Sequence, residues 1–378
     1  MTDWRKEWFE IEDAVYLNAA GQGPSPRAAI RATQQALEWK KFPHHIPESE
    51  YFGLPGRVRV LLAQLIGARP EEIALATGAS GGMQVVANRL ELRLGDEILI
   101  ARGEFPAHFA TWLPMQSATG ITVKIVAPRG RFLAADDFLA QITPRTRLIS
   151  ASLVGFKDAS RLDARCVADA VHAAGGFLLL DASQCAGAMP LTADSLGCDF
   201  LTAAGYKWLL SPYGTGFLWI RSSVMKELRE GPVYWQSLED AASFHSLPSG
   251  SYARPESALR WDSPETASFF NLAAMEASLE LIHRAGVETI WRHIRSLIEE
   301  LIRWLPLDRC VLGSPAESEA RGPFVCIQLR RPDGGPALHE KLQKANIVVS
   351  LRDGALRISP HLYNSERDLD RLLAVLAV

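Results

Sequence analysis

The middle of the chain alternates short apolar runs with longer stretches in which apolar residues recur at helical spacing. Each short run, bounded by turn residues, predicts a buried strand. The stretch 163–174, which ends at Gly175-Gly176, predicts one of the intervening helices. Strands that alternate with helices favour βαβ units and a mostly parallel sheet. The strands predicted in this way are 97–101, 122–126, 148–152, 177–181 and 216–220.

The C-terminal part has a different pattern. Between 269 and about 305, apolar residues recur every three or four positions, as in a long helical connector. The segment before it, 234–265, is rich in Ser, Pro and Gly and predicts an irregular, functional loop. After the connector the pattern predicts a strand at 324–329, a helix at 336–345, a hairpin of 347–350 with 356–359, and a closing helix at 365–376.

These patterns together predict the fold class and the domain division. We expect an α/β fold whose large domain, residues 26–265, is built on a mostly parallel sheet. Residues 1–25 and 266–378 form a smaller α+β domain, which includes the connecting helix. A length of 378 residues is enough for two such units and a sizeable core.

Composition and charge narrow the class of partner. The chain is 48% hydrophobic and has 40 Lys and Arg against 43 Asp and Glu, which gives a net charge of −3. No sustained basic tract is present, so the usual electrostatic reason to bind nucleic acid is missing. No stretch reaches the roughly 20 apolar residues that span a bilayer. We therefore expect a small-molecule substrate, and neither nucleic acid nor membrane as partner.

The cysteines and histidines argue against a disulfide framework and a metal site. The cysteines are odd in number, are scattered and never form a CxxC pair, and the N-terminal segment lacks the apolar region of a signal peptide. Reduced thiols and a cytoplasmic location follow as the expectation. His172, His283 and His293 occur singly on helical patterns, so no metal is predicted. The five cysteines are Cys166, Cys185, Cys198, Cys310 and Cys326.

The segment 177–216 carries the clearest chemical signal. Its apolar strand ends on Asp181, and Lys207 follows 26 residues later in a Gly-Tyr-Lys-Trp turn. In a parallel α/β sheet, ligands collect at the carboxyl ends of strands. A lysine in a partly apolar site has a lowered pKa and can attack an aldehyde as a nucleophile. Taken singly, an Asp or a Lys is more often a helix cap or a solvated loop residue, so the pair and its spacing carry the inference.

This segment resembles the cofactor core of the class V aminotransferase superfamily, which includes cysteine desulfurases, kynureninases and isopenicillin N epimerases. The resemblance extends from Tyr16 to Tyr363 and implies a pyridoxal 5'-phosphate enzyme of fold type I, aspartate-aminotransferase-like, with a seven-stranded-type sheet in the large domain. It implies that Lys207 forms the internal aldimine and removes the α-proton, and that Asp181 pairs with the pyridinium nitrogen. It further implies that Gln184 contacts the ring oxygen and Tyr206 the phosphate.

A small-residue loop upstream is a second candidate for binding the cofactor. Residues Gly78, Ala79 and Ser80 precede a helical pattern, so free backbone N–H groups and a helix N-terminus would face an anion. Loops of this kind are also often simple tight turns. By the resemblance they hold the cofactor phosphate, with Ala79 contributing its backbone in place of the more usual Thr.

Phe105 follows the strand 97–101 and occupies the place of the residue that stacks on the cofactor ring. Desulfurases have His there, whereas kynureninases have Phe followed by Pro, as in Phe105-Pro106. A phenyl ring stacks but does not titrate, so acid–base chemistry above the ring would fall to Lys207. On the sequence alone, Phe105 could equally be a core residue.

The substrate and a second subunit are implied by three further matches. Arg357 occupies the family's C-terminal signature, in which a planar guanidinium clamps the substrate carboxylate. Asn18 lies in the N-terminal turn that folds over the substrate. The segment 260–266 stands in place of a loop that reaches the phosphate of the neighbouring subunit, which implies Ser263 or Thr266 as contacts and a homodimer with shared active sites.

The reaction class is left open by these residues. The loop 347–357 contains no cysteine, so a persulfide nucleophile of the desulfurase type is not expected. Together with Phe105-Pro106, this slightly favours a C–S or C–C β-eliminating lyase. An aminotransferase or an amino-acid epimerase is the alternative, and a non-catalytic cofactor-binding homologue is an alternative of another class. The retained set Asp181, Gln184, Lys207 and Arg357 argues against loss of activity.

Overall fold

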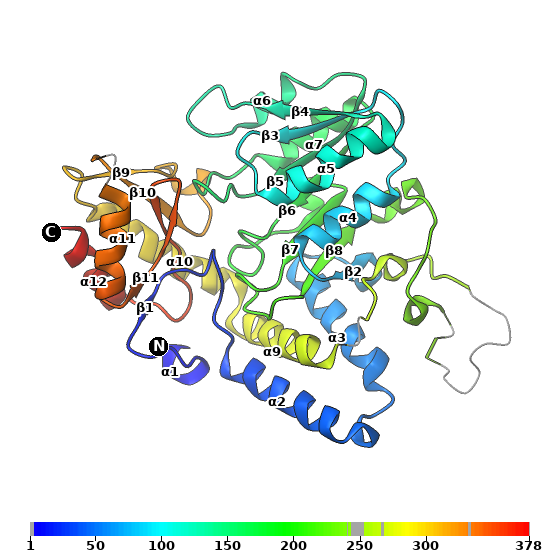
Figure 1. Cartoon of the computed structure of the whole chain (residues 1–378), viewed down its shortest axis with the longest axis horizontal. Coiled ribbons are helices and arrows are strands. Elements are labelled where there is room, and N and C mark those ends of the chain that lie inside the picture. The colour runs from blue at the N-terminus through cyan, green and yellow to red at the C-terminus, as the bar shows by residue number, and fades with distance from the viewer. Residues whose placement is uncertain (1–3, 240, 243–252, 266–267, 332–333, 378) are drawn as a thin grey trace.

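The large central sheet has seven strands, six of which are parallel to one another. The computed structural model describes residues 4–239, 241–242, 253–265, 268–331 and 334–377. The strand order is β2-β8-β7-β6-β5-β3-β4, and β8 alone runs antiparallel to its neighbours β2 and β7. The predicted α/β fold with a mostly parallel seven-stranded sheet is confirmed (Figure 1). The strands are β2 Ile73–Ala76, β3 Glu97–Ala101, β4 Thr122–Val126, β5 Thr146–Ser152, β6 Phe177–Asp181, β7 Phe200–Ala204 and β8 Gly216–Ile220.

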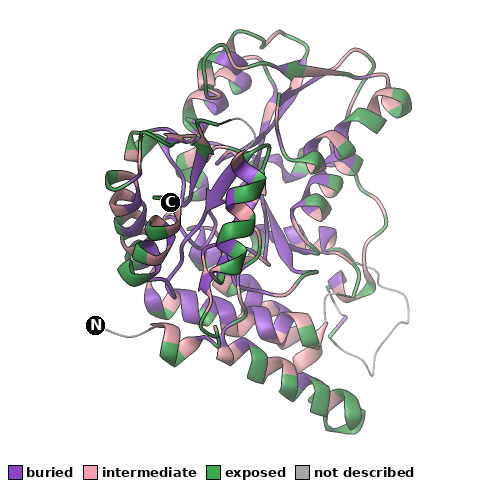
Figure 2. Ribbon diagram, turned by 60° about the vertical axis from the view of Figure 1, so that its left-hand side comes forward, coloured by how far each residue is buried: buried purple, intermediate pink, exposed green. Residues whose placement is uncertain are grey.

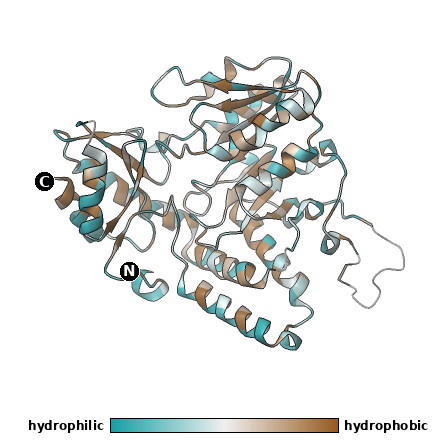
Figure 3. Ribbon diagram, viewed as in Figure 1, coloured by the Kyte–Doolittle hydropathy of each residue, from teal (hydrophilic) through white to brown (hydrophobic). Residues whose placement is uncertain are grey.

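Helices cover both faces of this sheet. Successive side chains of a strand point to opposite faces, so a strand that is apolar throughout needs cover on both sides. Leu179 packs in one apolar cluster with residues of α4 (Ala79–Arg89) and α5 (Pro106–Thr119). Its neighbour Leu180 packs in the other, with residues of α3 (Glu50–Leu65), α7 (Ala164–Ala173) and α9 (Phe269–Ala285). The central strands are therefore buried along their length (Figure 2) and apolar (Figure 3).

Further helices extend the covering of the large sheet. The long helix α2 (Arg27–Lys41) packs against α9, which also packs against α3. Two short helices, α6 (Ala135–Leu139) and α8 (Ala193–Leu196), connect strands of the sheet. In the loop 234–265 the described residues form only short 3₁₀ helices, Trp235–Ser237 and Ala258–Trp261, in agreement with the predicted irregular segment.

The predicted helical connector consists of two helices. α9 ends at Ala285, and α10 (Val287–Arg303) begins two residues later, after Gly286 with φ 78°. A positive φ is open to glycine without strain but interrupts a right-handed helix. The connector therefore turns at Gly286.

The second sheet is smaller and antiparallel, with strand order β12-β13-β10-β9. The predicted hairpin is correct only in part, because β12 (Ser350–Arg352) pairs with β13 (Ala355–Ile358), whereas β11 (Ile347–Val348) pairs in parallel with β1 (Val15–Tyr16). The N-terminal strand thus joins this part of the fold. The remaining elements here are α1 Trp4–Trp8, β9 Cys310–Leu312, β10 Val325–Leu329, α11 Gly334–Lys344 and α12 Glu366–Leu376. The domain boundaries after residues 25 and 265 stay a prediction.

Candidate active site

The candidate residues meet where the parallel strands of the large sheet end. Asp181 is the last residue of β6, Lys207 follows β7, and Phe105 follows β3 and caps α5. Because β3, β5, β6 and β7 are parallel, their carboxyl ends lie at one edge of the sheet, where α/β folds bind ligands. The predicted convergence of Asp181, Lys207 and Phe105 is thus a consequence of the topology.

The Lys207 side chain is buried against aromatic rings. It is 7% exposed, and its Nζ lies 5.2 Å from the ring centre of Phe105 and 5.7 Å from that of Tyr206. Burial lowers the pKa of Lys207 to about 8, opposed by the nearby Asp181 carboxylate and assisted by the positive charge of Arg357. The lowered pKa increases the fraction of this amine that is uncharged near neutral pH, which is the state that attacks an aldehyde.

Asp181 is held in place by its own loop. Its Oδ1 accepts a hydrogen bond of 2.8 Å from the backbone N–H of Ser183, and the residue is 6% exposed. On the other side, Oδ2 lies 4.0 Å from Nε2 of the buried His108. A fixed, buried carboxylate of this kind suits a protonated ring nitrogen.

The loop before α4 has the geometry of an anion cradle. Gly78 has φ 149° and leaves open space where a side chain would stand, and the backbone N–H groups of Ala79 and Ser80 open the helix without intrahelical acceptors. Gly216 packs directly beneath, since an added Cβ there would lie 2.6 Å from Cα of Gly78. The Ser80 side chain is exposed and free to meet a phosphate.

Gln184 and Tyr206 flank this region in different ways. The amide of Gln184 donates from Nε2 to the carbonyl oxygen of Ala20 and accepts at Oε1 from Trp208 Nε1, each over 3.3 Å. One amide N–H of Gln184 remains for a ring oxygen. The Tyr206 ring stacks on Tyr213 at 3.9 Å, and burial raises the pKa of its hydroxyl to about 12, so this hydroxyl is a hydrogen-bond donor near neutral pH.

Arg357 and Asn18 are brought together through Ser350. Nη2 of Arg357 donates to Ser350 Oγ over 3.2 Å, and Ser350 Oγ donates to Asn18 Oδ1 over 2.6 Å. Burial lowers the pKa of Arg357 to about 10. Its buried Nε has no hydrogen-bond partner, and no carboxylate of the described residues pairs with its guanidinium. Nη1 donates to the carbonyl oxygen of Phe156 over 3.3 Å, so the hydrogen-bond partners of this guanidinium among the described residues are neutral and its charge is available to an anionic ligand.

Of the two residues predicted to reach a neighbouring subunit, the structure describes one. Ser263 donates its backbone N–H to the carbonyl oxygen of Leu75, and its neighbour Asp262 accepts from the N–H of Leu75 and pairs with Arg59 at 2.8 Å. This segment is therefore fixed next to β2, which leads into the loop at Gly78. Thr266 lies outside the described residues.

Phe105 is not the core residue that the sequence also allowed. It is 37% exposed, and its ring packs edge-on against Phe156 at 5.4 Å. A half-open aromatic ring beside the Lys207 amine is suited to stack on a planar ligand.

A buried polar group was missed by the sequence analysis. Glu104 lies just before α5 and His108 in its first turn; Glu104 contacts Ser152 and His108 contacts Ser150, both on β5. Glu104 and His108 are visible in the sequence as two polar residues four positions apart where α5 begins. Nothing local shows that it faces Asp181, because that depends on how α5 packs on the sheet.

None of the cysteines has the environment of a reactive thiol. Cys326 is opposite Arg357 in the sheet, but it is buried and its Sγ donates to the carbonyl oxygen of Lys157 over 3.0 Å. Burial raises its pKa to about 12, and does the same for Cys185, so neither is a thiolate near neutral pH.

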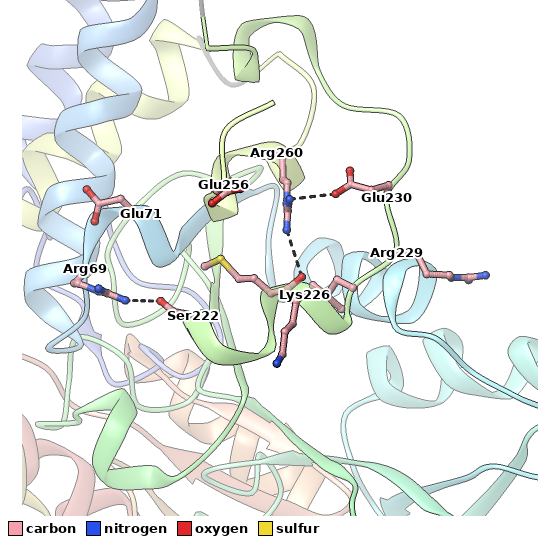
Figure 4. Close-up of a pocket in the computed structure, with 10 residues that line it drawn as sticks. Arg69, Glu71, Ser222, Lys226, Arg229, Glu230, Glu256 and Arg260 are labelled. Atoms are coloured by element: carbon pink, nitrogen blue, oxygen red, sulfur yellow. Dashed lines mark hydrogen bonds and ion pairs between the residues drawn. The ribbon is translucent and has the colours of Figure 1, made fainter. Parts of the chain in front are cut away.

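A cavity of about 930 Å³ lies elsewhere, beside the segment that follows β8 (Figure 4). Among its lining residues, Arg260 pairs with Glu230 at 3.2 Å, and Arg69 donates to the hydroxyl of Ser222. None of its lining residues is a predicted site residue. The candidate site therefore stays at the strand ends around Lys207.

The residues around Lys207 fit pyridoxal phosphate, which the sequence resemblance implies. The aldehyde would meet the Lys207 amine, the ring nitrogen would meet Asp181, and the phosphate would meet the open cradle at Gly78. No group of three or more metal-ligating side chains occurs within the described ranges. Across those same ranges, no helix is both long and apolar enough to cross a membrane.

Comparison with known proteins agrees with this geometry. The sequence model of the family Aminotransferase class-V matches residues 15–372. Isopenicillin N epimerase of Streptomyces clavuligerus is 28% identical over 374 residues, covering 95% of this chain and 93% of that protein. The uncharacterized aminotransferase YcbU of Bacillus subtilis is 25% identical over 307 residues, covering 81% and 79%. A solved complex of the cystine C-S lyase C-DES with its product cysteine persulfide has the same fold, with TM-score 0.87, 24% identity and 97% coverage of both chains.

Proposed function

Because this chain belongs to the class-V aminotransferase family and is a pyridoxal-phosphate enzyme, we propose that it is a lyase that eliminates a β-substituent from an α-amino acid. Lys207 is the base in this proposal. The substrate carboxylate binds the guanidinium of Arg357, whose Nε is buried without a partner. Ser350 accepts a hydrogen bond from that guanidinium and in turn donates one to Asn18, so the two residues orient it together.

Bound pyridoxal phosphate supplies a sink for the electron pair that the departing α-proton leaves behind. The protein groups position and move protons around it. Asp181, fixed by the N–H of Ser183, would hold the ring nitrogen of the cofactor and favour a proton on it. Lys207, whose pKa burial lowers to about 8, would take the α-proton and donate it to the leaving group.

One observation carries the choice of elimination over epimerisation. Phe105, Tyr206 and Lys207 lie next to one another at the site. Phe105 does not titrate, and the pKa of Tyr206 is raised to about 12, so of these three side chains only Lys207 exchanges protons readily near neutral pH. Elimination can proceed with one base. Inversion at the α-carbon requires a proton donor on the opposite face of the substrate.

An epimerase is the second candidate, supported by the near full-length similarity to isopenicillin N epimerase. An aminotransferase is the third, since the family name and the similarity to YcbU point to it. Both reactions begin with the same proton abstraction by Lys207. They differ from elimination in where the next proton goes, so product analysis separates them.

We also propose that the protein is a homodimer with shared active sites. The exposed faces of α2, α3 and α9 carry large apolar side chains: Ile30, Leu37, Val60 and Phe270 are 36–54% exposed. Apolar side chains gathered on packed helices favour contact with a second copy. Light scattering on the purified protein tests this, and a monomer at micromolar concentration would contradict it.

The function is tested by one assay on the purified, cofactor-loaded protein. A panel of L- and D-amino acids is added, and ammonia, keto acid, sulfide and the enantiomer are measured together with the cofactor absorption band. Continuous release of ammonia with a cleaved side chain is expected. Stoichiometric loss of the band with keto acid but no ammonia would instead identify an aminotransferase, and appearance of the enantiomer an epimerase.

Two variants control this assay. Lys207→Ala should abolish turnover and the borohydride-reducible attachment of the cofactor, because the amine is gone. Cys326→Ala should leave turnover unchanged, because the Cys326 thiol is buried and protonated. Loss of activity in Cys326→Ala would instead indicate that the Cys326 thiol takes part in the reaction, as in a persulfide mechanism.

A further inference from the structure

His108 is a fully buried side chain with an unusual set of neighbours. Its Nδ1 lies 2.9 Å from Ser150 Oγ, whereas its buried Nε2 has no hydrogen-bond partner. The nearest charged groups to Nε2 are two carboxylates, Glu104 Oε2 at 3.6 Å and Asp181 Oδ2 at 4.0 Å. Burying a polar atom without a hydrogen-bond partner costs free energy. An apolar side chain of similar shape would avoid this cost, so a histidine at this position requires an explanation.

The tautomer of His108 follows from these neighbours. A lone pair on Nε2 would face two carboxylates and be repelled, whereas an N–H there is attracted to both. The hydroxyl of Ser150 then donates to Nδ1, which fixes the proton on Nε2. His108 therefore presents an N–H between Glu104 and Asp181.

Glu104 is held rigidly on the other side. Its Oε1 accepts a hydrogen bond of 2.8 Å from the N–H of Ser152, and its Oε2 accepts from the Ser152 hydroxyl. Ser152 is the residue of β5 that lies opposite Asp181 of β6. The carboxylates of Glu104 and Asp181 are thus anchored by paired strands, with the imidazole of His108 between them.

We propose that His108 is a positioning residue that orients Asp181 toward the ring nitrogen of pyridoxal phosphate, with Glu104 and Ser150 holding its proton on Nε2. Oδ1 of Asp181 is already held by the Ser183 N–H. An N–H on Nε2 of His108, 4.0 Å from Oδ2, is too distant for a hydrogen bond but attracts that oxygen electrostatically. This attraction favours one rotation of the carboxylate, whose remaining lone pairs would meet the ring nitrogen. The orienting role of His108 toward the cofactor rests on the proposed function, whereas the tautomer and the contacts of His108 do not.

The first test uses the protein without cofactor and is independent of activity. Histidine is labelled with ¹⁵N, and the His108 signals are assigned by their absence in His108→Gln. We expect a protonated Nε2 and an unprotonated Nδ1, and we expect Glu104→Gln and Asp181→Asn each to shift the Nε2 signal. The signal of His293, whose Nε2 bonds the carbonyl oxygen of Asn364, serves as the control. A proton on Nδ1, or a signal that neither variant moves, overturns the proposal.

The second test compares two substitutions of His108 in the cofactor-loaded protein. His108→Gln keeps an N–H donor close to the position of Nε2, whereas His108→Phe fills the space without a donor. We expect His108→Phe to weaken cofactor binding about tenfold, the scale of losing a polar N–H next to a buried carboxylate, and His108→Gln to restore most of it. Equal affinities for the two variants would show that His108 only fills space and would overturn the proposal.

The two tests also separate this proposal from the proposed function. If the wild type binds no pyridoxal phosphate, the proposed function fails, while the ¹⁵N signals still report whether His108 contacts Asp181. If the wild type binds it and both His108 variants bind as tightly, only the positioning role fails. If His108→Phe does not fold, the ¹⁵N shifts of Glu104→Gln and Asp181→Asn decide.

Discussion

The guanidinium of Arg357 donates a hydrogen bond of 3.2 Å to the hydroxyl of Ser350, which lies directly opposite it on the neighbouring strand. The same hydroxyl donates to Asn18, a residue that reaches this sheet from the N-terminal turn. Ser350 therefore links the two predicted substrate-binding residues. It also restricts the rotation of a side chain that must meet a carboxylate in one orientation.

Arg357→Ala should raise KM for amino-acid substrates about a hundredfold, since a bidentate contact between guanidinium and carboxylate is worth about 3 kcal/mol. Cofactor affinity should change little, because Asp181, Lys207 and the loop at Gly78 are intact. Steady-state kinetics and a cofactor titration measure the two quantities.

Two further variants calibrate that measurement. Ser350→Ala should raise KM by a smaller factor, because the guanidinium remains but loses its fixed orientation. Arg367→Ala, on the exposed side of α12, should leave KM unchanged. An unaltered KM in Arg357→Ala would exclude Arg357 from carboxylate binding.

The titration of Lys207 in the cofactor-free protein should respond to two neighbours with opposite signs. Acetylation of its amine should rise with pH through about 8, the pKa of Lys207. Asp181 raises this pKa and Arg357 lowers it, so Asp181→Asn should move the midpoint to lower pH and Arg357→Gln to higher pH. Mass spectrometry of the Lys207 peptide after brief acetylation gives the midpoint. Shifts in one common direction would contradict the electrostatic assignment.

Gly216→Ala should weaken phosphate binding through the backbone. The added Cβ would stand 2.5 Å from the carbonyl oxygen of Ala203 and 2.6 Å from Cα of Gly78, so the cradle must shift. We expect a loss of affinity for pyridoxal phosphate of about tenfold or more, and a much smaller loss for pyridoxal, which lacks the phosphate. Gly56→Ala, within α3 where an added Cβ meets nothing within 4 Å and φ is not positive, is the control for a glycine outside the cradle. Equal losses of affinity for pyridoxal phosphate and pyridoxal would show that the substitution does not act through phosphate binding.

Glu97→Gln should lower the free energy of unfolding at neutral pH and should change it only slightly at acid pH. Burial alone would raise the pKa of Glu97, but hydrogen bonds from Lys124, Thr143 and Arg145 outweigh it and lower the pKa to about 2. With an unfolded value near 4.3, this stabilisation is present above about pH 4.3 and is lost as the pH falls toward 2.

We expect a difference in the free energy of unfolding of about 2 kcal/mol at pH 7, reduced by solvent around Arg145, and a smaller one at pH 3. Urea unfolding at the two pH values measures it. Glu48→Gln, on an exposed loop, should show no such dependence. A constant difference at both pH values would mean that Glu97 acts by packing rather than by charge.

Much of the large sheet could be predicted because its signal is local. Apolar runs such as 177–181 are buried on both faces, so their composition alone indicates a strand. Topology then places Asp181 and Lys207 at one edge, since parallel strands end together. The shorter strands were harder: β11 is only two residues long, and its partner β1 is more than 300 positions away, so nothing near it in sequence indicates the pairing.

The sequence by itself determined five of the seven strands of the large sheet and the family, and it indicated the candidate site residues, because each depends on a local pattern or on a motif that is contiguous in the chain. Only the tertiary structure decided which neighbours tune those residues. Ser350 meets Asn18 across 332 positions, and Ser152 meets Glu104 across 48. Such contacts are made by the packing of distant segments, and burial then strengthens their electrostatic effect on Asp181, Lys207 and Arg357.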